Sequence, residues 1–261
     1  MSVVQSLWIG TVLPPLQQLG IRSFLMNGHS YHLYVYGPVA GVPDGVIMCD
    51  ASEILPQESV FCYQEGYGKG SSSAFSNLFR YQLIHDRGGW WVDTDVVCLK
   101  RLTFDDEFVF ATEIDNDLIH QCATCAFKSP AGAAYLKYCI DVVHSKDKMK
   151  LQWGEIGPLL LDEAVKRFGL ADHRAPVHAF NPIHYFEFQQ IIERGFDPSR
   201  LAQSHGVHLW NQMWKTHDMD PAAVAPPDSL YGVLARQYGA DIEVVPARNS
   251  NQHVWVPGLR G

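Results

Sequence analysis

Apolar positions along the chain form two kinds of pattern, short continuous runs and longer stretches with a helical period. The short runs are rich in β-branched and aromatic residues and predict strands at 3–9, 32–36, 46–49, 90–99, 108–113 and 121–128. The periodic stretches predict helices at 14–27, 71–86, 131–144 and 158–168. We expect 46–49 to be a short buried strand and 90–99 to be one uninterrupted, strongly apolar strand.

This order of elements predicts the fold class. Strands that alternate with helices indicate an α/β domain with a mostly parallel central sheet flanked by helices. The last third of the chain is richer in Pro, His and Trp and less regular. It predicts loops and short helices that close over the carboxyl ends of the strands, where such folds bind ligands. We expect residues 1–261 to form a single domain.

Composition narrows the class further. The chain has 261 residues, 47% of them hydrophobic and 18% charged, which is enough apolar mass for a core and excludes a disordered chain or a disulfide-stapled mini-fold. Its formal net charge is −8, and a nonspecific nucleic-acid binder needs a surplus of cations. We therefore expect no nucleic-acid partner, and contact with phosphate through a metal ion or a few placed cations.

The N-terminal segment and the cysteines indicate the cellular compartment in which the protein is expected. The first cationic side chain is Arg22, so no positively charged segment precedes the uncharged run 1–21, and Pro14-Pro15 and Gly20 interrupt that run. We expect no transmembrane segment and a cytoplasmic protein, with peripheral contact at the inner face of the membrane as an option. The six cysteines predict buried free thiols, and Cys122 and Cys125 are interpreted as core residues rather than a metal or redox pair.

The chemistry centres on Asp93 and Asp95. Two apart in the predicted strand 90–99, they are expected to share one face among apolar neighbours. Carboxylates so placed repel each other, and either a proton or a cation relieves the repulsion; a hard divalent ion, Mg²⁺ or Mn²⁺, fits oxygen ligands. Replacing one of them should then leave the metal-free protein as stable or more stable. The alternative is that Asp93 opens a turn and Asp95 is solvated.

The preceding helix carries a polar stripe. Ser73, Ser76, Asn77 and Arg80 fall on one helical face, while Phe75, Leu78, Phe79 and Leu83 mark the core face. The stripe is expected to direct Arg80 towards the two aspartates. An ordinary surface arginine is the alternative.

Together these residues resemble a known family. Arg80, Gly88-Gly89, Trp91, Asp93 and Asp95 are similar to the DXD sugar-binding region of glycosyltransferases that include fungal outer-chain mannosyltransferases, α-1,4-galactosyltransferases, bacterial capsule and lipooligosaccharide transferases and, more distantly, glucosylating toxins. Trp91 stands where the family usually has Tyr. Asn77 stands where it often has Asp.

Further segments extend the resemblance. Leu7-Trp8-Ile9-Gly10 resembles the family's W-x-G, which implies that the Trp8 ring stacks on the nucleobase; a core aromatic is the alternative. Gly157-Pro158 resembles its Gly-Pro step before a helix. His208, with Trp214-Lys215, resembles a late H-x5-W-K element, which implies that His208 completes the metal shell and that Lys215 meets the leaving diphosphate.

The resemblance implies a GT-A-like fold and retaining transfer of a hexose from a nucleotide-diphosphate sugar to a hydroxyl of a glycan or glycolipid, in surface polysaccharide synthesis. A UDP-sugar is the favoured donor and GDP-mannose the other. The implied halves are 1–130 for the nucleotide sugar and 131–261 for acceptor binding and closure. The implied site comprises catalytic Asp93, Asp95 and Arg80; donor-binding Trp8, Gly10, Asn77, Arg80, Trp91, Asp93, Trp214 and Lys215; and a Mn²⁺ or Mg²⁺ site of Asp93, Asp95 and His208.

Some alternatives remain open at this stage. A non-catalytic sugar- or metal-binding relative is one, and a haloacid-dehalogenase-like phosphatase is a weaker one, because Val96-Val97 continues the strand where that class needs a small turn. Glu113, Asp115 and Asp117 either bind sugar hydroxyls or form a solvated acidic loop. Residues 207–215 are expected to be a mobile lid, with fixed core positions for Trp210 and Trp214 as the alternative.

Overall fold

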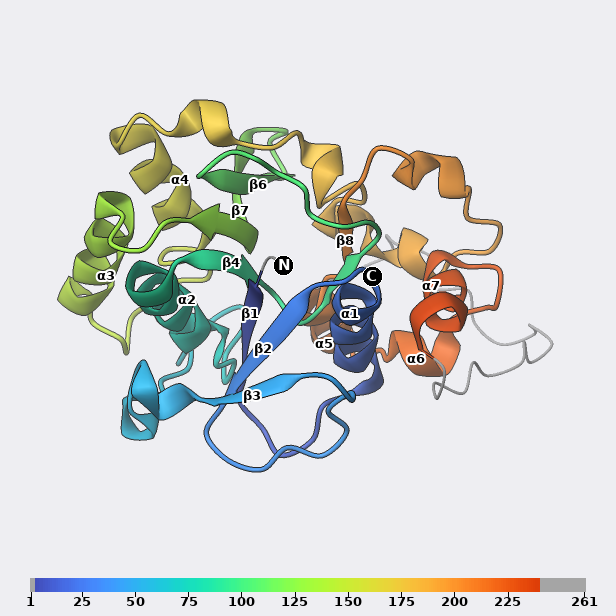
Figure 1. Ribbon diagram of the computed structural model, residues 1–261, viewed down its shortest axis with the longest axis horizontal. Helices are drawn as coiled ribbons and strands as arrows, with labels where there is room; N and C mark the ends of the chain where they lie inside the picture. The colour runs from blue at the N-terminus through green and yellow to red at the C-terminus, as the bar shows by residue number, and fades with distance from the viewer. Residues whose placement is uncertain (1–2, 240–261) are drawn as a thin grey trace, which may run out of the picture.

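A computed structural model describes residues 3–239 of the chain. Its centre is a six-stranded sheet with the strand order β3-β2-β1-β4-β7-β6 (Figure 1). The bounds of these strands are β1 Val3–Trp8, β2 Ser30–Val35, β3 Ile47–Asp50, β4 Gly89–Val92, β6 Val109–Ile114 and β7 His120–Ser129. The pairs β1–β2, β2–β3 and β1–β4 are parallel, whereas β7 is antiparallel to both β4 and β6. The sheet is mixed and largely parallel, which confirms the predicted fold class.

Helices cover both faces of this sheet. Their bounds are α1 Pro15–Met26, α2 Ser73–Arg87, α3 Ala134–Ser145, α4 Pro158–Arg167, α5 Asn211–Thr216, α6 Pro221–Val224 and α7 Leu230–Tyr238. In Figure 1, α2, α3 and α4 lie on one side of the sheet, and α1 lies on the other with the C-terminal helices. The four helices predicted from the sequence are therefore confirmed, and the last third, as far as residue 239, is built mainly of short helices and turns as expected.

Successive side chains of β4 point to opposite faces of the sheet and belong to two separate hydrophobic clusters, one on each face. Trp91 packs with Phe75 and Phe79 of α2, while Trp90 and Val92 point to the opposite face, towards Phe24 of α1. A third cluster joins α1 to the C-terminal region around Trp214. Each layer buries the apolar stripe of a helix against one face of the sheet, as the helical period predicts.

The prediction of one strand over 90–99 is wrong. The chain leaves the sheet after Val92 and forms a turn, and β5 (Val96–Cys98) then pairs antiparallel with β8 (Gly206–His208) in a separate two-stranded sheet. The Asp93 N–H still donates to the Cys125 carbonyl of β7, and the chain then turns away because Val96–Cys98 pairs with β8 instead of extending β4. This turn carries both aspartates.

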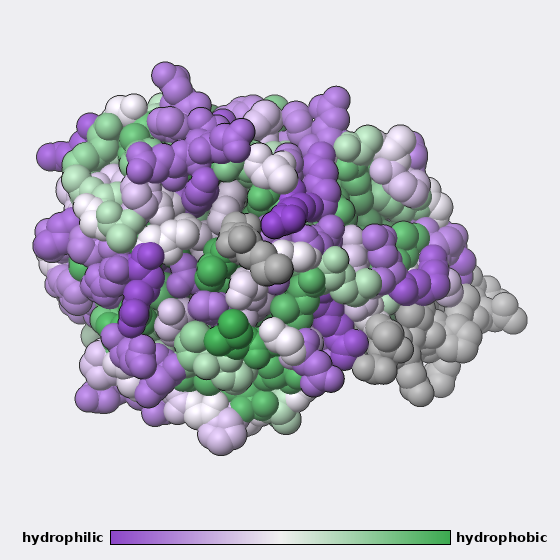
Figure 2. Space-filling model, in the orientation of Figure 1, coloured by the Kyte–Doolittle hydropathy of each residue, from purple (hydrophilic) through white to green (hydrophobic). Residues whose placement is uncertain are grey.

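The edge of the sheet also differs from expectation. β3 is an edge strand rather than a buried one, with Ile47 and Met48 48% and 44% exposed. Figure 2 shows hydrophobic surface over the region where Figure 1 places β3. Among the described residues, no helix is long and apolar enough to cross a membrane.

The cysteines follow the prediction in the main. All six are free, and four are buried, while Cys49 and Cys62 are partly exposed. Cys122 and Cys125 belong to clusters on opposite faces of the sheet, so they cannot share one metal ion. They are core residues, as predicted.

Candidate active site

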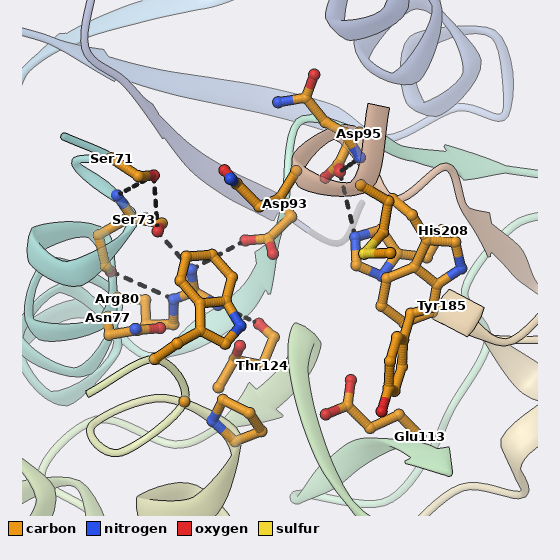
Figure 3. Close-up of a pocket in the computed structure, with 18 of the residues that line it drawn as sticks. Ser71, Ser73, Asn77, Arg80, Asp93, Asp95, Glu113, Thr124, Tyr185 and His208 are labelled. Atoms are coloured by element: carbon orange, nitrogen blue, oxygen red, sulfur yellow. Dashed lines mark hydrogen bonds and ion pairs between the residues drawn. The ribbon is translucent and has the colours of Figure 1, made fainter. Parts of the chain in front are cut away.

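A cavity of about 600 Å³ opens at the carboxyl ends of β1 and β4. It receives side chains from β1, α2, the turn after β4, the hairpin of β6 and β7, and the segment 208–215 (Figure 3). Of the residues predicted for the site, the following line it: Trp8, Asn77, Arg80, Trp91, Asp93, Asp95, His208 and Lys215. The fold thus assembles most of the predicted site from segments far apart in the sequence.

Asp93 and Asp95 lie at the two ends of the turn that links β4 to β5. The turn is closed by a hydrogen bond from the Val96 N–H to the Asp93 carbonyl, 3.0 Å long. The two side chains therefore do not share the face of one strand, and the expected geometry is corrected. Asp93 does open a turn, as the alternative held, but Asp95 is only 8% exposed and is not solvated.

Helix α1 packs closely against this turn at Gly20. A Cβ atom on Gly20 would lie 2.3 Å from the Thr94 carbonyl oxygen and 2.9 Å from that of Val96. Contacts that short do not occur between real side chains and backbone, so the position requires glycine. Gly20 appeared in the sequence only as a break in an uncharged run. Its role in seating the turn depends on the packing of α1 against β5.

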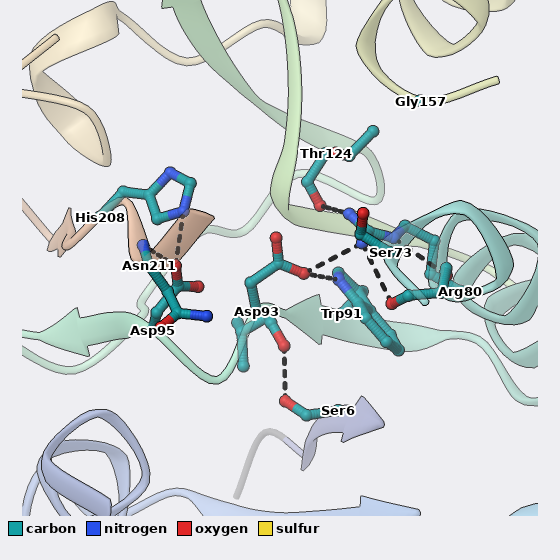
Figure 4. A network of polar contacts seen from close by, with 12 residues as sticks. Ser6, Ser73, Arg80, Trp91, Asp93, Asp95, Thr124, Gly157, His208 and Asn211 are labelled. Atoms are coloured by element: carbon teal, nitrogen blue, oxygen red, sulfur yellow. Dashed lines mark hydrogen bonds and ion pairs between the residues drawn. The ribbon is translucent and has the colours of Figure 1, made fainter. Parts of the chain in front are cut away.

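Asp93 is paired with the cation on α2. The Arg80 Nη2 atom lies 3.2 Å from Asp93 Oδ1, and Trp91 Nε1 donates to the same oxygen at 2.8 Å (Figure 4). Arg80 is 4% exposed, donates from Nη1 to the Thr124 carbonyl at 2.6 Å, and stacks 4.9 Å from the Trp91 ring centre. Burial raises the pKa of Asp93 and outweighs the opposing effect of Arg80.

Asp95 has a cationic partner of its own. His208 Nε2 lies 3.2 Å from Asp95 Oδ2, and the N–H of Asn211, at the start of α5, donates to the same oxygen at 2.8 Å (Figure 4). Burial disfavours the charge on Asp95, but His208 and these hydrogen bonds lower its pKa. Burial likewise acts against a charged His208, yet the Asp95 carboxylate raises the pKa of His208 well above its ordinary value.

The three predicted metal ligands come together. One ligand atom from each of Asp93, Asp95 and His208 lies within 4.8 Å of the other two. Two carboxylate oxygens and one imidazole nitrogen suit a divalent ion that accepts mixed oxygen and nitrogen ligands. The residues therefore fit a metal ion, and His208 would have to be neutral to serve as a ligand.

Other predicted residues take more specific positions. Trp8 lines the main cavity and also a neighbouring hollow of about 340 Å³, together with Gly10 and Tyr36, so its ring is not simply a core aromatic. A Cβ on Gly10 would lie 3.1 Å from Trp8 Nε1, so glycine leaves room for the indole. Asn77 is 6% exposed and lies against Gly157, where an added Cβ would be 3.0 Å from its Nδ2.

Trp214 is the predicted donor-binding residue that the structure does not bring to the cavity. Its ring is 1% exposed, donates from Nε1 to the Leu209 carbonyl at 2.6 Å, and packs edge-on against Phe188 with ring centres 4.6 Å apart. Lys215, the next residue, lines the cavity. Val207, Leu209 and Trp214 belong to the core, which agrees with the alternative of fixed core positions, and the mobile lid over 207–215 stays a prediction.

Several cavity residues had no signal in the sequence pattern. The Asn211 N–H donates to Asp95, and the Thr124 carbonyl accepts from Arg80. Tyr63, Tyr67 and Trp153 form an aromatic group, with ring centres 5.1 Å apart for Tyr63–Trp153 and 5.0 Å for Tyr67–Trp153. Tyr63 and Tyr67 lie in the loop before α2 and Trp153 in the loop before α4, and only the tertiary structure brings the two loops together.

One family of known proteins matches part of this chain. Residues 149–242 match the family described as "Alpha 1,4-glycosyltransferase conserved region". The matched segment includes His208 and Lys215, and it shows that the chain carries the conserved region of a glycosyltransferase family, which confirms the predicted resemblance and the enzyme class.

Solved structures give more distant similarities. A structure described as "PaToxG Glycosyltransferase" is similar at 14% identity and a TM-score of 0.45, covering 64% of this chain and 69% of that chain. A structure described as a transferase mutant is similar at 14% identity and a TM-score of 0.44, covering 75% of this chain and 91% of that one. No curated protein matches the chain.

Proposed function

We propose that the protein is a metal-dependent, retaining glycosyltransferase. It transfers a hexose from a nucleotide-diphosphate sugar, with a UDP-sugar as the favoured donor, to a hydroxyl group of a glycan or glycolipid. The observation that carries this proposal is the convergence of Asp93, Asp95 and His208 beside the buried cation of Arg80 in one cavity. A Mn²⁺ or Mg²⁺ ion held by the three side chains would neutralise charge on the donor diphosphate.

The charges of the cavity support an anionic donor. The protein carries a formal net charge of −8, yet Arg80 and Lys215 both line this cavity. Breaking the bond between the sugar and the diphosphate leaves negative charge on the nucleotide. Lys215 is free to meet that charge, and Arg80, already fixed by Ser76 and Thr124, is preorganised to hold a sugar or phosphate oxygen.

The hollow beside the main cavity supports a nucleobase site. Trp8 lies between the two spaces, and Tyr36 supplies a second aromatic ring to the smaller one. A planar base needs an aromatic face and a slot close to the diphosphate, and Gly10 leaves that slot open. We assign the base to this hollow and the hexose to the main cavity.

We further propose that the chain acts as one domain in which both halves build the site. Residues before 130 supply Trp8, Arg80 and the two aspartates, and residues after it supply His208 and Lys215. Pairing of β5 with β8 joins the halves beside the metal ligands. The predicted division thus describes binding roles rather than separable units; residues 240–261 of the second half lie outside the described residues.

The decisive experiment measures release of UDP from UDP-glucose and UDP-galactose, and of GDP from GDP-mannose, with Mn²⁺ and with EDTA. We expect slow metal-dependent hydrolysis without an acceptor, lost in Asp95→Asn. Binding of a nucleotide sugar without any turnover would favour a non-catalytic relative. Hydrolysis of a simple phosphomonoester at a higher rate than any nucleotide sugar would favour a phosphatase.

A further inference from the structure

Glu113 places a carboxyl group in the cavity apart from the metal ligands. It lies near the end of β6, directly opposite Gln121 of β7, and Gln121 Nε2 donates to Glu113 Oε1 at 2.9 Å. This hydrogen bond fixes the plane of the carboxyl group and occupies one oxygen. Both residues line the cavity. Asn116 of the hairpin turn also lines the cavity, whereas Asp117, the next residue, is exposed and does not.

The two polar walls of the cavity are chemically different. Figure 3 shows Asn77 and Arg80 on one side and Glu113, Tyr185 and His208 on the other, with the Glu113 carboxyl group directed into the space between them. The guanidinium of Arg80 can only donate hydrogen bonds. A hexose presents hydroxyl groups around its whole ring, so a single donor wall leaves part of the ring without partners.

We propose that Glu113 is a sugar-binding residue of this cavity, which forms hydrogen bonds with the hexose of the donor from the side opposite Arg80. This inference rests on the proposed function and adds the wall that recognises the transferred sugar. Gln121 is a positioning residue, since it acts through Glu113.

The electrostatics of the position agree with this role. Burial raises the pKa of Glu113 to about 7, against the opposing effects of Gln121 and His208. Asp93 and Asp115 add negative charge nearby, and the Tyr185 hydroxyl group also faces Glu113. A carboxyl group that holds its proton both donates and accepts hydrogen bonds, and it does not repel a diphosphate.

The test compares UDP with UDP-glucose and UDP-galactose by calorimetry in the presence of Mn²⁺, and GDP with GDP-mannose if UDP does not bind. Because the free nucleotide lacks the hexose, the ratio of the two dissociation constants isolates the sugar contact and cancels titration of the metal ligands. The variants are Glu113→Ala and Glu113→Gln. Asp117→Asn is the matched control, since it removes a carboxylate from the same hairpin outside the cavity.

We expect Glu113→Ala to weaken binding of the nucleotide sugar about tenfold, the equivalent of about 1.4 kcal/mol, and to change binding of the free nucleotide less than about twofold. As pH rises from 6 to 8, the advantage of the nucleotide sugar should shrink more in the wild-type protein than in Glu113→Gln, because only the wild-type protein loses a proton at Glu113. Titration of the terminal phosphate of the free nucleotide is common to both proteins and cancels in this comparison, which decides the matter if Glu113→Ala does not fold.

Two results separate the inference from the proposal beneath it. Equal weakening of both ligands by Glu113→Ala, or no weakening, overturns the role of Glu113 and leaves the transferase proposal standing. Failure of UDP, GDP and their sugars to bind the wild-type protein with Mn²⁺ overturns the proposed function and this inference with it.

Discussion

Arg80 on α2 and Asp93 in the turn after β4 form an ion pair, with Nη2 3.2 Å from Oδ1, in which Arg80 is buried and Asp93 is 23% exposed. Arg80 Nη2 also donates to the Ser76 hydroxyl, and Nη1 donates to the Thr124 carbonyl. A fixed cation therefore stands beside one of the proposed metal ligands. This arrangement orients Asp93 and would keep one cationic group ready for the proposed donor.

Replacing Arg80 should affect activity and stability together. Lysine presents a single point charge and cannot satisfy Asp93, Ser76 and Thr124 from one plane. We expect Arg80→Lys to lower the rate of nucleotide-sugar hydrolysis at least about a hundredfold and to cost about 3 kcal/mol of unfolding free energy, since it breaks the contacts of a buried guanidinium. Urea unfolding and the hydrolysis assay measure the two effects. Arg87→Lys, at the exposed end of the same helix, is the control and should change neither.

The two aspartates should contribute to stability as well as activity. The sequence alone suggested two unmatched like charges, whose removal would be neutral or stabilising. In the structure Asp93 is paired with Arg80 and Asp95 with His208. Neutralising Asp93 leaves the buried Arg80 cation without its partner, and neutralising Asp95 leaves His208 and the Asn211 N–H without their charged acceptor. We expect Asp93→Asn and Asp95→Asn to abolish metal-dependent hydrolysis and to lower unfolding free energy by about 1–3 kcal/mol.

Thermal and urea unfolding in the presence of EDTA measure the unfolding free energy of the metal-free protein. Asp141→Asn on α3, which removes an exposed partner of Lys137, should leave the unfolding midpoint within error and the activity intact. Unchanged stability of both active-site variants would contradict the pairing seen here, and full hydrolysis by Asp95→Asn would contradict the metal site.

Local patterns predicted what lies within one element. The stripe of α2 was legible because Asn77 and Arg80 share a helical face with their polar neighbours, and the structure directs both into the cavity. The helix bounds followed from the same periodicity, and most strands followed from short continuous apolar runs. The family resemblance then linked His208 to the aspartates, a step that spacing along the chain could not make.

What the sequence did not predict depends on contacts between distant segments. The apolar run 90–99 looks like one strand, but its second part leaves the sheet because β8, over a hundred residues later, provides another partner. Trp214 and Lys215 are adjacent in the chain, and no local pattern tells which of them faces the core. The pairing of Glu113 with Gln121 likewise depends on the register of the β6–β7 hairpin.

Gly20 should be a sensitive position far from the motif in sequence. An alanine Cβ would clash with the Thr94 and Val96 carbonyl oxygens, so helix α1 or the turn has to move. We expect Gly20→Ala to lower unfolding free energy by about 1–3 kcal/mol and to weaken Mn²⁺ binding, because the aspartates flank the displaced turn. Met26→Ala, at an exposed position of the same helix, is the control. Mn²⁺ affinity equal to that of the wild type would show that the turn tolerates the displacement.

Substitutions at the neighbouring residues Trp214 and Lys215 should separate an effect on stability from an effect on ligand binding most clearly. Trp214 is buried against Phe188 and bonded to the Leu209 carbonyl, whereas Lys215 is exposed at the cavity. Trp214→Ala should therefore cost about 3–5 kcal/mol of unfolding free energy, as for other buried tryptophans.

Lys215→Ala should leave the unfolding midpoint unchanged and weaken binding of UDP with Mn²⁺ about five- to twentyfold, since a partly solvated cation contributes about 1–2 kcal/mol towards a diphosphate. Calorimetry of UDP binding and thermal unfolding of both variants check the two expectations. Trp214→Phe keeps most of the packing and loses only the indole N–H bond, so it should bind UDP as tightly as the wild type. A large loss of UDP affinity in Trp214→Phe, with the fold intact, would instead restore the donor-binding role that the sequence suggested for Trp214.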